Sequence, residues 1–160
     1  MRRVLNLLVL TLLLAGCSQQ ADTGPVEVRW DKESCERCAM AFGDRNYSAQ
    51  VRGGPADTPT RVYKFDDIGC AVIWLDKQAW KDDSRTEIWV TDYRNGNWIN
   101  ARQASYVTGK VTPMGYGLGA QSKQADGALD FTAASKHIYS VENREHKHKG
   151  DHMQHMESGN

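Results

Sequence analysis

Two cysteines and a methionine lie within six residues of one another near the start of the chain: Cys35, Cys38 and Met40. Thiol and thioether sulfurs are soft ligands, and a methionine sulfur binds a polarisable monovalent ion far better than it binds zinc, magnesium or calcium. Sulfur ligands at this spacing therefore indicate a site for Cu(I).

Other interpretations of this motif stay open. Cys35 and Cys38 could form a disulfide or structural pair, with Met40 as part of the core. A redox-active C-x-x-C motif opens a helix after a buried strand, because the helix N-terminus lowers the pKa of the first thiol. Here residues 31–34 are charged or polar instead. A structural zinc site needs a second short-spaced pair of ligands, and Cys70 stands alone, which makes zinc the weaker metal.

Cys70 follows two acidic residues, Asp66 and Asp67, that can cap a helix. The apolar residues that recur at helical spacing after them are Ile68, Ala71, Val72, Leu75 and Ala79. Because Cys70 lies on the wide apolar face of this helix, the sequence favours a buried, inert thiol. The functional alternative is a reserve sulfur ligand.

The N-terminus has the features of a bacterial lipoprotein signal. A cationic start precedes an apolar run at 4–15, and Leu14-Ala15-Gly16-Cys17 resembles a lipobox. The run is too short for a permanent membrane span, so we expect residues 1–16 to be removed and Cys17 to be lipidated. Ser18, in place of Asp, favours the outer membrane. An ordinary secretory peptide with an incidental cysteine is the alternative.

Residues 17–25 are polar and form the expected tether. Loss of Arg2 and Arg3 with the signal would leave 18 basic and 20 acidic residues, a net charge of −2, which excludes a nucleic-acid-binding role. The remaining length suits one domain, or two very small units that share a core. Three thiols in an oxidising compartment cannot all pair, so at least one is free or metal-bound.

The alternation of apolar and polar residues predicts short strands at 26–30, 47–51, 62–65 and 86–91. Asn95-Gly96 is a typical hairpin turn that leads into Trp98-Ile99, and residues 105–112 look extended. A second helix begins at Asp130 or Thr132. Each half of the chain thus consists of two strands and a helix, which predicts an α+β domain over residues 26–145.

A glycine-rich segment, residues 113–120, contains Met114. It lacks the Lys-Ser/Thr pair of a nucleotide-binding loop, so we discount that function. The glycines are expected to let the backbone pack closely around Met114, which is either a core residue or a sulfur ligand.

The C-terminal tail, residues 146–160, is polar and is predicted to be disordered. It could be an auxiliary copper site, since methionine suits Cu(I) and imidazole suits Cu(II). It could equally be a solvated tail that binds metals adventitiously. The candidate ligands are His146, His148, His152, Met153, His155 and Met156.

Together these motifs resemble the NosL family of accessory lipoproteins, which serve the maturation of nitrous oxide reductase. The resemblance spans nearly all of the mature chain. It is carried by Leu14-Ala15-Gly16-Cys17, by Cys35-x-x-Cys38-x-Met40, by Phe65-Asp66-Asp67-Ile68-Gly69-Cys70 and by Met114-Gly115-Tyr116-Gly117-Leu118-Gly119-Ala120.

The resemblance implies a periplasm-facing, lipid-anchored Cu(I) chaperone. Its partners would be the Nos copper-delivery membrane complex and, directly or indirectly, nitrous oxide reductase. The implied fold is α+β, with two small related ββαβ-like units that share a core. Carried over to this chain, Cys38 and Met40 are the primary copper ligands, Met114 is the downstream ligand, and Cys35 is either an accessory ligand or a disulfide partner.

No nucleophile, base and substrate pocket can be assembled from the sequence, so we predict that the protein is not an enzyme. Two other classes of function remain. A periplasmic thiol-disulfide oxidoreductase would need Cys35 and Cys38 to cycle and would not need the methionines. A structural lipoprotein would bind no copper in its core and would use its methionines for packing.

Overall fold

The computed structural model describes residues 23–157. The predicted signal peptide, the lipidation site Cys17 and most of the tether lie outside the described residues. In the described part of the chain, no helix has the length and apolar character needed to cross a membrane.

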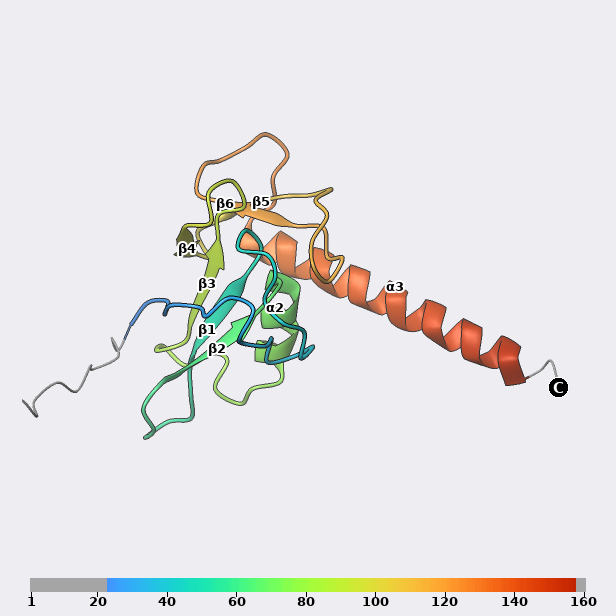
Figure 1. Ribbon diagram of the computed structural model, residues 1–160, viewed down its shortest axis with the longest axis horizontal. Coiled ribbons are helices and arrows are strands. Elements are labelled where there is room, and N and C mark those ends of the chain that lie inside the picture. The colour runs from blue at the N-terminus through green and yellow to red at the C-terminus, as the bar shows by residue number, and fades with distance from the viewer. Residues whose placement is uncertain (1–22, 158–160) are drawn as a thin grey trace, which may run out of the picture.

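A four-stranded antiparallel sheet forms the centre of the fold (Figure 1). Its strands are ordered β2-β1-β3-β4. In the register of the sheet, Ala49 of the central strand β1 lies opposite Phe65 on one side and Val90 on the other. All three side chains are buried, and they form part of the core. The strands are β1 (Ala49–Gly53), β2 (Arg61–Phe65), β3 (Glu87–Thr91) and β4 (Trp98–Asn100).

The first helix of the described residues is α2 (Ile68–Asp76), and only Asp66 and Asp67 separate it from the end of β2. Asp67 is its N-cap, and the carboxylate accepts a hydrogen bond of 2.9 Å from the backbone N–H of Gly69. Seven of its nine residues are buried, so α2 lies within the core, against β1 and β2. It ends before Ala79, where the sequence pattern had continued.

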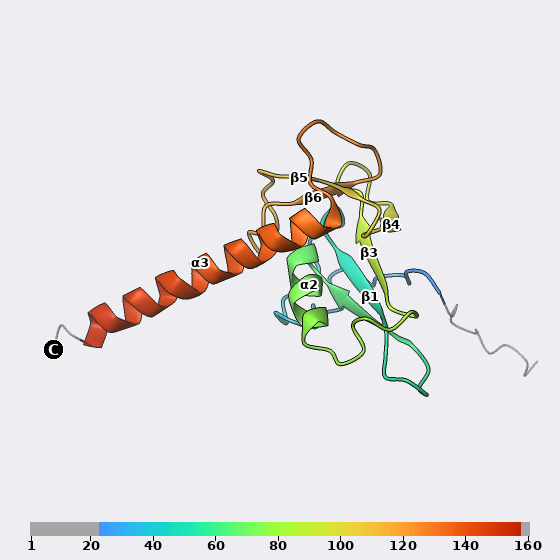
Figure 2. The same ribbon diagram turned by 180° about the vertical axis from the view of Figure 1, so that it is seen from behind.

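A second, two-stranded sheet is formed by β5 (Ser105–Val107) and β6 (Gly119–Gln121). The last helix, α3 (Phe131–Glu157), follows, and the Asp130 carboxylate accepts a hydrogen bond from the N–H of Ala133 in its first turn. The N-terminal part of α3 contacts β5 and α2, and the helix then extends away from the rest of the molecule (Figures 1 and 2).

The α+β prediction is confirmed. The order β1-β2-α2-β3 is a ββαβ unit, whereas the second half consists of β5, β6 and α3 with no strand after the helix in the described residues. The strand predicted at 26–30 is wrong, because this segment pairs with a side chain instead. The backbone N–H and C=O of Val26 bond the Gln50 amide at 2.8 Å each.

The tail also differs from the prediction of disorder. Residues 146–157 continue α3 as a helix instead of leaving it. The composition allows this, because the segment holds no proline and six of its twelve residues are Lys, Met, Gln or Glu, which suit a helix.

Candidate metal centre

Cys35 and Cys38 belong to a tight loop that its own backbone closes. Ser34 and Ala41 form an isolated antiparallel bridge across the base of this loop. Inside it, the N–H of Cys35 donates to the carbonyl of Met40, and the N–H of Ala39 donates to the carbonyl of Cys35, each at 2.9 Å. Ala39 has a φ of 60°, the left-handed conformation that turns the chain back. The two thiols thereby belong to a turn that its own backbone hydrogen bonds close.

The loop is also attached to the sheet. The N–H of Glu36 donates to the carbonyl of Lys64 in β2 at 2.9 Å, and the Lys64 ammonium pairs with the Glu33 carboxylate at 2.6 Å. Because β2 leads directly into α2, this attachment places the loop beside the start of that helix.

The junction between β2 and α2 supplies two more ligand atoms. Asp67 caps the helix, which leaves the neighbouring carboxylate of Asp66 free to turn toward the loop. Cys70 lies in the first turn of α2, four residues after Asp66, and its side chain is fully buried.

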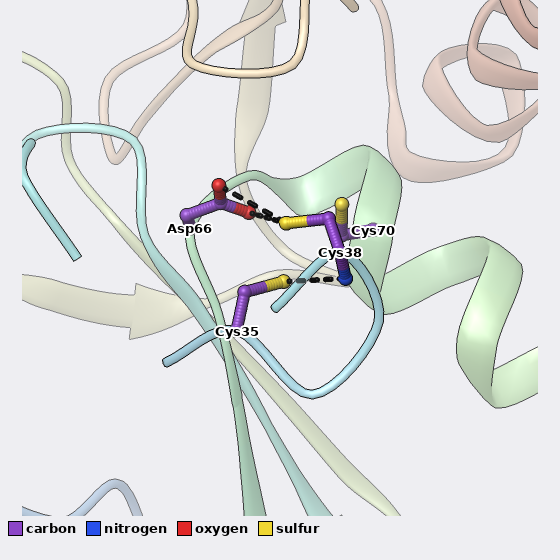
Figure 3. Close-up of side chains that lie close together, drawn as sticks. All are labelled: Cys35, Cys38, Asp66 and Cys70. Carbon is purple, nitrogen blue, oxygen red and sulfur yellow. Dashed lines mark hydrogen bonds between the residues drawn. The ribbon is translucent and has the colours of Figure 1, made fainter. Parts of the chain in front are cut away.

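Four ligand atoms meet where the loop faces this junction (Figure 3). The sulfurs of Cys35, Cys38 and Cys70 and a carboxylate oxygen of Asp66 all lie within 4.8 Å of one another. The Cys38 sulfur is 3.4 Å from both carboxylate oxygens of Asp66. All three cysteines are free thiols. We call these four residues the metal centre.

The close contacts shift the pKa values of the three thiols in different directions. A hydrogen bond from Cys70 lowers the pKa of Cys35 below its usual 9.0. Burial raises the pKa of Cys38, and the hydrogen bond to Cys35 raises that of Cys70. Burial raises the pKa of Asp66 to about 6. One thiolate is therefore stabilised by its protonated neighbours, and a bound cation would replace those protons.

Three sulfurs and one carboxylate could hold a metal ion, and three of these four donors are soft. Such a set suits Cu(I) through its thiolates. It also supplies four ligands of the kind that hold tetrahedral Zn²⁺, so the argument against zinc from missing ligands is wrong. The geometry does not match a redox motif of the helix-opening kind, because residues 36–38 form a turn and not the start of a helix.

The two methionines predicted as ligands lie on loops connected to the metal centre. Met40 closes the cysteine loop through its carbonyl, and half of its surface, 50%, is exposed. Met114 is partly buried, and its backbone N–H donates to the carboxylate of Asp67 at 3.3 Å. The structure thus brings both residues to the neighbourhood of the site, and the role of their sulfurs stays a prediction.

Asp66 and Cys70 are the two members of the metal centre that the sequence did not place there. Asp66 was predicted as a possible helix cap and as part of a family motif, and Cys70 was favoured as an inert thiol, with a reserve sulfur ligand as the alternative. Cys70 is buried as expected, but its sulfur faces two thiols and a carboxylate. Their spacing of four residues across a strand-to-helix junction was the signal that could have identified them, together with the odd number of thiols.

The six tail residues proposed as auxiliary ligands stay a prediction. Their backbone lies in α3, and their side chains fall outside the part of the chain for which side chains are described.

The structure is similar to the crystal structure of the copper chaperone NosL from Shewanella denitrificans, with 18% sequence identity, a TM-score of 0.45, and coverage of 72% of this chain and 87% of that chain. No curated protein sequence matches significantly. The family model named NosL matches residues 25–143, which include all four residues of the metal centre. The chain therefore belongs to the NosL family.

Proposed function

We propose that this protein is a copper chaperone that carries one Cu(I) ion as cargo at its metal centre. The observation that carries the proposal is the convergence of three free thiols and a carboxylate within 4.8 Å, in a chain of the NosL family. Cys35, Cys38 and Cys70 would supply soft ligands, and Cys38 would share the ion with the thioether of Met40.

The exposure of Met40 supports transfer as well as binding. Cys35 and Cys70 are buried, at 3% and 0% exposure, whereas Met40, on the same loop as Cys35, is exposed at the surface. A thioether needs no deprotonation and cannot be lost to a disulfide, so it suits a ligand at the entrance of the site. A partner could then attack the ion from the Met40 side while the buried thiolates still hold it. Met114 would be a second thioether that approaches from the glycine-rich loop.

The cellular setting is part of the same proposal. Lipidation at Cys17 would hold the protein at the membrane, facing the periplasm, in the outer membrane if Ser18 directs sorting. The copper would pass to the Nos copper-delivery membrane complex and, directly or indirectly, to nitrous oxide reductase. In this role the protein would bind and release its cargo without catalysing a reaction.

A complementation experiment tests delivery. A denitrifying host that lacks its own NosL would express this protein as wild type, as Cys38→Ser, or as Asp126→Asn. Asp126 is exposed and distant in sequence from all four residues of the metal centre. We expect wild type and Asp126→Asn to restore nitrous oxide reduction, and Cys38→Ser to leave reductase that is synthesised but poor in copper. Full reductase copper with Cys38→Ser would contradict the proposal.

A further inference from the structure

Arg37 stands between the two cysteines of the loop and contacts the third. Its Nη1 donates to the sulfur of Cys70, at 3.7 Å, and to the hydroxyl of Tyr116, at 3.0 Å. Its Nη2 pairs with the carboxylate of Glu142 in α3. The guanidinium therefore joins the metal centre to the last helix and to the glycine-rich loop.

The surroundings fix the guanidinium in this position. The Tyr116 hydroxyl also donates to Glu142, and the backbone carbonyl of Tyr116 bonds the ring of His137 at 2.9 Å. The Tyr116 ring lies so close to Gly69 that a Cβ there would be 2.2 Å from it. The side chains of Arg37 and Glu142 are mostly buried, at 22% and 15% exposure. Tyr116 and Glu142 thus hold Arg37 in place, with its Nη1 directed at Cys70.

This arrangement matters because a bound Cu(I) ion would not neutralise all the negative charge of its thiolate ligands. Three thiolates around a monovalent ion carry excess negative charge, and burying such charge without a partner is unfavourable. Among the described residues, Arg37 is the cation with a hydrogen bond to a sulfur of the metal centre. A fully buried sulfur such as Cys70 has no solvent to offset its charge, so the guanidinium is the group that can do so.

We propose that Arg37 is a positioning residue that makes Cys70 the third sulfur ligand of the cargo ion. When Tyr116 and Glu142 hold Arg37 in place, Cu(I) binds the sulfurs of all three cysteines. Without it, Cys70 does not join the ligand set, and the ion is held by Cys35 and Cys38 with the thioether. The inference rests on the proposed function and specifies the ligand set of that same site.

A double-mutant cycle tests this coupling. The mature protein would be prepared as wild type, Arg37→Gln, Cys70→Ser and the double variant, and Cu(I) affinity would be measured anaerobically by chelator competition. A hydrogen bond to a charged group is worth about tenfold to a hundredfold in affinity, which is the loss expected for Arg37→Gln. In the Cys70→Ser background, the same substitution is expected to change affinity less than about twofold, because its target is absent.

X-ray absorption of the loaded protein supplies a readout that a merely structural role would not move. The number of sulfur ligands around copper is expected to fall by one in Arg37→Gln and in Cys70→Ser alike. Arg102→Gln removes the same charge from a side chain that stacks on Phe131, and it is expected to match wild type. If Arg37→Gln does not fold, Arg37→Lys replaces it in the test. The lysine keeps the charge, but its single ammonium cannot contact Cys70, Tyr116 and Glu142 together as the planar guanidinium does.

The outcomes separate this inference from the proposed function. If wild type binds no Cu(I), both the proposed function and the inference that rests on it are wrong. If wild type binds Cu(I) and an Arg37 variant keeps both its affinity and its sulfur count, the function stands and the role of Arg37 is wrong. An equal loss with and without Cys70 would also overturn the inference, because the effect would then not act through that sulfur.

Discussion

The three thiols of the metal centre have the same chemistry but different surroundings. Cys35 accepts the hydrogen bond of Cys70, which lowers its pKa, while burial and the same contacts raise the pKa of Cys38 and Cys70. A thiol whose pKa is lowered to about 4, as that of Cys35 is, would be charged at neutral pH, whereas a thiol whose pKa is raised is neutral there. We therefore predict that the metal-free site holds one thiolate at neutral pH, and that binding of a metal ion would release the remaining protons.

This difference predicts a stepwise thiolate titration. In the reduced, metal-free protein, the ultraviolet absorbance of thiolate should correspond to one cysteine at neutral pH. This signal should disappear when the pH falls through the lowered pKa of Cys35. The signals of the other two thiols should appear only in alkaline solution. Cys35→Ser should remove the neutral-pH signal. Three thiols that ionise together near the usual value of 9.0 would contradict this account.

The elements that matter most are the cysteine loop and the junction between β2 and α2. The junction depends on close packing, because Gly69 in the first turn of α2 lies directly under the Tyr116 ring. A side chain at this position would push α2 away from the glycine-rich loop. Since Cys70 is the next residue, the metal centre would move with it.

Gly69→Ala is therefore expected to disturb both stability and binding. Overpacking of this kind typically lowers the free energy of unfolding by about 1–3 kcal/mol, which urea denaturation can measure. Gly43→Ala is the matched control, because an added Cβ there meets nothing within 4 Å. Its effect should stay within about 0.5 kcal/mol of wild type. Equal stability of the two variants would show that the Tyr116 contact is not tight.

The sequence predicted most of these elements because their signals are local. The alternation in β1, β2 and β3, the Asn95-Gly96 turn and the Asp67 cap each depend on neighbouring residues. The strand at 26–30 failed because the partner of Val26 is the side chain of Gln50, a contact between distant segments. For the same reason the contribution of Asp66 to the metal centre was missed and that of Cys70 was only an alternative, since only the folded chain shows that the loop faces the junction.

Considered as a whole, the protein has two regions with candidate metal ligands. The metal centre lies in the folded body, while the His- and Met-rich segment lies at the far end of α3 (Figure 1). If both bind copper, a measured stoichiometry combines sites of different kinds.

The tail prediction follows from this separation. A variant with alanine at His146, His148, His152, Met153, His155 and Met156 should keep one tightly bound Cu(I) with wild-type affinity. The weaker ions that wild type takes up beyond the first should be lost, as equilibrium dialysis and metal analysis would measure. Loss of the tight ion in this variant would place the principal site in the tail.

The proposed function depends on Cu(I) binding at the cysteine loop. The most direct measurement is an anaerobic Cu(I) titration against a competing chelator, with wild type, Cys38→Ser and Met40→Leu, repeated with Zn²⁺. We predict one tight Cu(I) in wild type, its loss in Cys38→Ser, weaker binding in Met40→Leu, and a Zn²⁺ affinity that Met40→Leu does not change. Undiminished Cu(I) binding in both variants, or none in wild type, would contradict the account.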